Sequence, residues 1–136
     1  MKYIRILFPV FCSLLIWSSC SKHYYPIAQL KKQLTGSWKL VSQGGGFGNL
    51  PETETKDDVV IEFTSDGVYR SFTDNTLQTE TRYTIKYAES VITGKENYVI
   101  VLKDEKPYLN FTVSDTELVL SGDHVDAMYF KYTKTD

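Results

Sequence analysis

The chain has 136 residues, of which 15 are basic and 17 acidic, and its formal net charge at pH 7 is −2. The charges are scattered and form no basic stripe with aromatic neighbours, so the composition argues against nucleic-acid binding. Tyrosine is frequent, with ten residues. It suits the half-buried face of a β-sheet and also a recognition surface, so both interpretations stay open.

The first twenty residues have the order of a secretory signal. Two basic residues, Lys2 and Arg5, precede an apolar run over residues 6–17, and Cys20 follows two serines. A cysteine at this position resembles the lipobox of bacterial lipoproteins, which implies a signal peptide over residues 1–19 and a lipid on Cys20. Secretion with an unmodified Cys20 and a transmembrane anchor are the alternatives, although a spanning helix needs about 20 apolar residues.

Cleavage before Cys20 would determine how the mature chain is held together. Cys12 would leave with the signal and Cys20 would carry lipid, so no thiol remains for a disulfide and a hydrophobic core must hold the fold. We expect residues 20–26 to be a lipid-anchored tether and residues 27–136 to be one domain. In some bacterial lipoproteins an aspartate after the cysteine retains the protein on the inner membrane, and in others an acidic cluster is associated with surface export. Ser21 and Lys22 supply neither signal, so the expected location is the outer membrane, facing the periplasm.

The mature chain has one convincing helical stretch, over residues 27–34. Ile27, Leu30 and Leu34 recur at positions i, i+3 and i+7, which places them on one face of a helix. Thr35 and Gly36 follow, and glycine is the residue expected just after a helix. The pattern therefore predicts a short N-terminal helix.

The remaining sequence is typical of β-structure. Asp66-Gly67 between two apolar runs is the strongest hairpin signal. Short connections favour pairing between consecutive strands, and closure into an up-and-down antiparallel barrel removes both exposed edges. The sequence therefore predicts an all-β, eight-stranded barrel. The strands are expected over residues 37–43, 58–64, 68–73, 80–87, 98–103, 108–113, 117–121 and 127–133.

A glycine-rich segment, residues 44–56, separates the first two predicted strands. It begins with Gly44-Gly45-Gly46, contains Pro51 and runs into an acidic stretch. Those carboxylates would repel a phosphate, so the glycines do not predict a phosphate site. We expect a mobile lid over the barrel mouth, and a disordered connector is the equally weighted alternative.

The sequence Gly36-Ser37-Trp38 resembles the Gly-x-Trp motif that opens the first strand of lipocalin-like domains. Residues 61–69 and the closing strand around Tyr129 are also similar to the small lipocalin-like domains of bacterial, Bacteroidetes-type lipoproteins. The resemblance covers residues 34–133 and implies a barrel with a short N-terminal helix. Trp38 would close the bottom of the barrel and pack against the helix, with Lys131 or Lys134 as a cation over its ring.

The inward-facing side chains either fill the barrel or line a cavity, because eight strands can do both. A cavity would bind a small hydrophobic or amphipathic ligand, whereas a filled barrel would dock a protein or glycan of the envelope. The candidate pocket residues are Leu40, Phe63, Phe72, Tyr83, Tyr87, Tyr98, Tyr108, Phe111 and Phe130. Further residues expected to face inward are Ile61, Ile85, Ile100, Leu102, Leu109, Leu118, Leu120 and Met128.

Catalytic chemistry has little support in the sequence. His124 is flanked by Asp123 and Asp126, which could in principle bind a metal. Such a segment is more often an exposed polar turn, and His23 lies in the tether. No nucleophile elbow or zinc signature occurs. We therefore expect a binding protein without catalytic residues, cofactor or metal.

Overall fold

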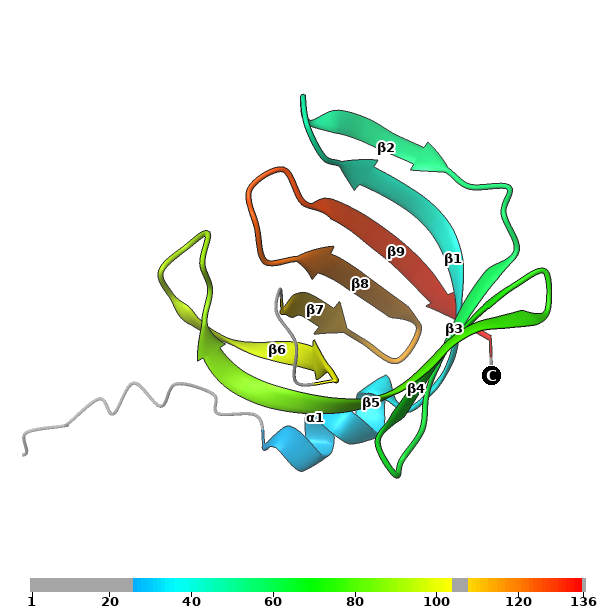
Figure 1. Cartoon of the computed structure of the whole chain (residues 1–136), viewed down its shortest axis with the longest axis horizontal. Helices are drawn as coiled ribbons and strands as arrows, with labels where there is room; N and C mark the ends of the chain where they lie inside the picture. Colours follow the sequence, from blue (N-terminus) through cyan, green and yellow to red (C-terminus); the bar gives the residue numbers. More distant parts are fainter. Residues whose placement is uncertain (1–25, 104–107, 136) are drawn as a thin grey trace, which may run out of the picture.

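The computed structural model of the chain describes residues 26–103 and 108–135 (Figure 1). The predicted signal peptide and Cys20 lie outside the described residues. The helix α1 spans Ile27–Leu34, as predicted. The strands are β1 (Gly36–Gly45), β2 (Leu50–Glu54), β3 (Val59–Phe63), β4 (Val68–Thr73), β5 (Thr76–Glu89), β6 (Glu96–Leu102), β7 (Leu109–Val113), β8 (Glu117–Gly122) and β9 (Met128–Lys134).

Eight strands form a closed antiparallel barrel, which confirms the predicted fold class. Strands β1 and β3 to β9 pair in sequence order, and β1 also pairs with β9 to close the ring. The seam between β6 and β7 is short, with register pairs at Val99↔Asn110 and Ile100↔Leu109. By contrast, β1 and β9 are paired from Trp38↔Lys134 to Gly45↔Met128.

The ninth strand, β2, corrects the prediction for residues 44–56. The sequence predicts a loop there, but Gly44 and Gly45 extend β1, and β2 pairs back along β1 from Gly45↔Leu50 to Ser42↔Glu54. All five β2 residues are exposed, so its side chains show no apolar alternation that the sequence could reveal. Pro51 and two glutamates lie on this edge strand, and both residue types discourage further strand pairing.

The interior holds one contiguous apolar cluster. Its buried members come from the helix end and from every barrel strand except β4. On β6, side chains on both faces of the strand are buried. Val99 and Val101 on one face are as inaccessible as Ile100 on the other. The buried members of the cluster are Leu34, Trp38, Leu40, Ile61, Phe63, Tyr83, Ile85, Ile100, Phe111, Leu118, Leu120 and Tyr132.

Trp38 joins the helix to the barrel, as the motif predicts. Gly36 has a φ of 135°, a conformation that glycine adopts most easily, and it turns the chain from the helix into β1. The indole of Trp38 is fully buried, and its Nε1–H donates to the carbonyl oxygen of Leu34 at 2.8 Å. The Nζ of Lys134 lies 5.1 Å from the ring centroid. Lys134 therefore supplies the expected cation, whereas Lys131 pairs with Glu52.

Three tyrosines belong to the packed interior. The Phe63 ring lies 5.0 Å from the ring of Tyr83 and 5.2 Å from that of Tyr69, centroid to centroid. The hydroxyl of Tyr83 donates to the carbonyl oxygen of Thr64. Burial raises the pKa of Tyr69, Tyr83 and Tyr132, because desolvation disfavours the phenolate. These tyrosines stabilise the core.

Phe72 is predicted to face inward but does not do so. Phe72 pairs with Val60, which pairs in turn with the exposed Lys39, so the register places Phe72 on the outer face of the barrel. The inward positions of β4 are the alternate ones, including Tyr69 and Ser71. Alternation of side chains along β4 therefore does not show which of its two faces points into the barrel. Met128 shares the inward face of β9 with Phe130 and Tyr132, but it is the first residue of the strand and is 37% exposed.

The helices among residues 26–103 and 108–135 include none that could cross a bilayer, since none combines sufficient length with an apolar sequence. The transmembrane alternative for residues 6–17 concerns a part of the chain outside this range.

Candidate functional site

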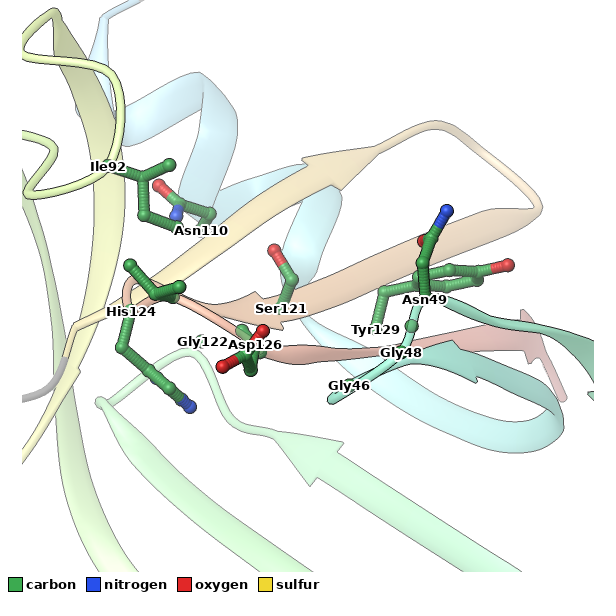
Figure 2. A pocket seen from close by; sticks show the side chains of 13 residues that line it. Gly46, Gly48, Asn49, Ile92, Asn110, Ser121, Gly122, His124, Asp126 and Tyr129 are labelled. Carbon is green, nitrogen blue, oxygen red and sulfur yellow. The ribbon is translucent and has the colours of Figure 1, made fainter.

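A hollow of about 640 Å³ lies where three hairpin connections meet at one end of the barrel. These connections are the β1–β2 turn, the β5–β6 loop and the β8–β9 loop, and β7 and β8 contribute the wall between them. Figure 2 shows the side chains of Ile92, Asn110 and Ser121 above the backbone of the β8–β9 loop. We call this site the loop hollow. It is lined by Gly45, Gly46, Gly48, Asn49, Ile92, Asn110, Ser121, Gly122, His124, Val125, Asp126, Ala127 and Tyr129.

The β1–β2 turn and the β8–β9 loop are tied together by their backbones. Gly46 donates its N–H to the carbonyl oxygen of Ala127 at 3.1 Å. Gly46, Gly48 and Asn49 have φ values between 50° and 84°, a region that glycine and asparagine tolerate best. Asp126 also has a positive φ, of 64°. The glycine run therefore shapes one wall of the loop hollow, rather than forming a lid.

A buried carboxylate on the β8–β9 loop, that of Asp123, binds the β5–β6 loop and β7. Asp123, 3% exposed, accepts hydrogen bonds from the hydroxyl of Ser90 at 2.7 Å and the backbone N–H of Val91 at 2.9 Å. It also accepts one from Nδ2 of Asn110 at 3.2 Å. Burial alone would raise the pKa of Asp123, but the hydrogen bonds outweigh it and hold the pKa below its usual value. Asp123 thus connects the ends of β5 and β8 to β7.

Tyr129 forms the wall beside β1. Its ring lies over Gly44, since a Cβ at that glycine would be 2.6 Å from the Tyr129 hydroxyl oxygen. Glu52 on β2 accepts hydrogen bonds from Ser42 at 2.6 Å and from Lys131 at 3.0 Å. The hydrogen bond from Ser42 and then that from Lys131 lower the pKa of Glu52. These contacts hold the β1–β2 hairpin against β9.

Replacing Gly44 with alanine should displace the Tyr129 ring toward the loop hollow. The backbone of Gly44 is not in the left-handed region, so the cost is steric, and overpacking of this kind costs about 1–3 kcal/mol. Urea unfolding of Gly44→Ala, Tyr129→Ala and the double variant measures it. Because the ring is absent in the double variant, Gly44→Ala should cost much less there. Equal costs in both backgrounds would contradict this packing.

His124 packs against Gly122, where an added Cβ would lie 2.6 Å from Nδ1 of the imidazole. Its neighbour Asp123 is turned away toward Ser90 and Asn110. Among the described residues no three His, Cys, Asp or Glu side chains are placed to hold a metal ion. The carboxylates on either side of His124 therefore have different environments, with Asp123 buried and Asp126 lining the hollow.

Each of the three loops that form the loop hollow carries an exposed apolar side chain. Phe47 on the β1–β2 turn is 88% exposed, and Val91 and Val125 on the other two loops are each 76% exposed. Ile92 and Val125 also line the hollow itself. Three separate loops at one end of the barrel thus each present an exposed apolar residue, which favours contact with an apolar group of a ligand or partner.

The nine predicted pocket residues lie elsewhere. Four of them belong to the buried core, and Tyr98 and Phe130 are partly buried against it. Tyr87 is 39% exposed and its ring contacts that of Tyr98. Tyr108 lines a separate hollow beside the β5–β6 loop. The four core residues are Leu40, Phe63, Tyr83 and Phe111.

The fold instead brings together two segments that the sequence presents separately. The glycine run from Gly45 and the segment His124–Ala127 lie side by side and both line the loop hollow. Asn110 and Ser121 complete it from β7 and β8, and they are paired across those strands. Single polar residues within strands have no pattern that marks them as site residues, so only the pairing register reveals them.

Comparisons with protein-family models, with curated proteins and with solved structures found no match to this chain.

Proposed function

We propose that this protein binds a small amphipathic ligand in the loop hollow, without turning it over. The observation that carries the proposal is a hollow of about 640 Å³ formed jointly by three loops and edged by exposed apolar side chains. Small-molecule sites typically measure about 300–1,000 Å³ and combine apolar walls with a few placed polar groups. Asn49, Asn110 and Ser121 supply such groups.

Binding without catalysis agrees with the chemistry of the buried carboxylate. Asp123 already accepts hydrogen bonds from Ser90, Val91 and Asn110. A carboxylate engaged in this way stabilises its ionised form and is poorly placed to move a proton. Its role is to hold the loops in position, and a preformed wall lowers the ordering cost of binding.

Filling the hollow should abolish binding. Ser121→Trp places an indole in the wall, whereas Thr112→Trp puts the same ring on an exposed position of the adjacent strand β7, outside the hollow. We expect an organic extract of the producing cells to shift the NMR signals of Asn49 and Val125 in the wild type and in Thr112→Trp, but not in Ser121→Trp. Shifts of equal size in all three proteins would contradict the proposed site.

A second candidate function is docking of a protein or glycan of the cell envelope. The exposed side chains of Phe47 and Val125 favour this function, because exposed apolar residues also suit contact with a larger partner. Replacing both Phe47 and Val125 with serine would then abolish capture of the partner, while Ser121→Trp would leave capture intact. The reverse pattern supports the small-ligand proposal.

We also propose that the protein is a lipoprotein with a lipocalin-like barrel, anchored by Cys20 to the outer membrane and facing the periplasm. The basic residues, apolar run and cysteine at the start of the chain support the anchor. The helix, the Gly36–Trp38 motif and the closed eight-stranded barrel support the likeness in fold.

Replacing Cys20 should release the protein from the membrane. We expect Cys20→Ala to incorporate no labelled palmitate in the producing organism and to fractionate as a soluble protein, because the acyl chains supply the membrane affinity. Cys12→Ala is the matched control and should stay labelled. Labelling of Cys20→Ala, or its retention in the membrane, would contradict the anchor.

A further inference from the structure

The lining of the loop hollow offers no fixed positive charge. None of its thirteen residues is lysine or arginine, and Asp126 contributes a carboxylate. His124 is the one lining side chain that could become cationic. An anion entering the hollow would therefore meet a negative group with no lysine or arginine to offset it, and like charges repel.

Three backbone N–H groups of the lining are already used within the turns. The N–H of Gly46 donates to Ala127, that of Asn49 to Gly46, and that of Ala127 to His124. Anion-binding backbone sites need several free N–H groups pointing at one spot. These three groups instead close the turns, so they stabilise the wall and do not face a ligand.

The floor of the hollow has acceptor character. Asn110 turns its Nδ2 toward the buried Asp123 carboxylate, which leaves its Oδ1 free to accept. Asp123 is ionised at neutral pH, so a negative charge lies directly behind Asn110. With Asp126 on the β8–β9 loop, the polar part of the hollow is suited to groups that donate hydrogen bonds.

We infer that the loop hollow selects ligands that donate hydrogen bonds and carry no negative charge, namely ammonium or polyhydroxyl head groups attached to a short apolar part. This inference rests on the proposed binding function. The apolar part would contact Ile92 and Val125, and the head group would face Asn110 and Asp126. Carboxylate, sulfate and phosphate amphiphiles would be excluded by charge.

Three probes with the same octyl chain test the inference. Octylammonium, octyl glucoside and octyl sulfate are titrated below their micelle concentrations at pH 8, with calorimetry for affinity and amide NMR shifts for location. We expect the first two to shift Asn49, Ser121 and Val125, and octyl sulfate to bind on the order of tenfold more weakly. His124→Gln repeats the series without an imidazole and should preserve the order.

Asp126→Asn isolates the charge, because asparagine tolerates the positive φ of this position. It should weaken octylammonium by roughly three- to tenfold and leave octyl glucoside unchanged. Asp74→Asn is the matched control, since Asp74 also has a positive φ and is exposed in the β4–β5 turn, outside the loop hollow. It should change neither affinity.

One result would contradict the charge selection alone, and another would contradict ligand binding at the loop hollow altogether. Octyl sulfate that binds at the hollow as tightly as the other probes would overturn the charge selection and leave ligand binding at this site standing. Absence of shifts in the lining residues with every probe would overturn the proposed function and this inference with it. An unchanged octylammonium affinity in Asp126→Asn would remove the assigned role of that carboxylate.

Discussion

Trp38→Ala should lower the free energy of unfolding by about 3–5 kcal/mol, the cost typical of removing a buried large aromatic side chain. Trp38 is fully buried between the helix end and the barrel. The substitution leaves a cavity, removes the donor to the Leu34 carbonyl and removes the ring beneath Lys134. A loss of this size is a large part of the stability of a small domain.

Urea unfolding monitored by circular dichroism measures this cost. Trp38→Phe keeps a ring but loses the indole N–H, and should fall between the wild type and Trp38→Ala. Phe47→Ala is the matched control, because it truncates an exposed aromatic residue, and such surface changes stay within about 0.5 kcal/mol. A Trp38→Ala protein as stable as the wild type would show that Trp38 does not join helix and barrel.

Asp123→Asn should destabilise the protein by about 2–4 kcal/mol, although it barely changes the size of the side chain. The donors from Ser90, Val91 and Asn110 all point at carboxylate oxygens. An amide group would place its own NH₂ against one or more of these donors. The end of β5 would then lose its connection to β8, and the loop hollow would lose its floor.

The effect of Asp123 should depend on pH in a defined direction. Its folded-state pKa lies below the ordinary value of 3.8, so the carboxylate stabilises the fold above the unfolded-state pKa of about 4. That contribution is lost as the pH falls through the folded-state value. The stability difference between the wild type and Asp123→Asn should therefore be constant from pH 7 to pH 5 and shrink below pH 4. A difference that grows toward low pH would contradict an ionised Asp123.

The barrel could be predicted from the sequence because its determinants are local. The Asp66-Gly67 turn, the Gly36–Trp38 junction and the apolar runs of β3, β6 and β8 each define an element on their own. Strand β2 could not be predicted in this way. Its five side chains are exposed, and its pairing depends on the backbone of β1, which no side-chain pattern reports.

The loop hollow was beyond sequence reasoning for a related reason. Its residues come from β1, the β5–β6 loop, β7, β8, the β8–β9 loop and β9, so only closure of the barrel assembles them. Aromatic residues predicted to line a pocket, such as Phe63 and Tyr83, belong to the core. The sequence predicts an exposed polar turn for Asp123, with metal binding as the less favoured alternative, whereas the fold buries this side chain as the anchor of three elements.

Native mass spectrometry of the protein purified from its own host tests the binding proposal most directly, with Ser121→Trp and Thr112→Trp prepared in parallel. The wild type and Thr112→Trp are expected to carry one noncovalent small molecule without negative charge, and Ser121→Trp to carry none. A wild-type protein that shows only its own mass, or the same bound species in Ser121→Trp, would contradict a ligand site in the loop hollow.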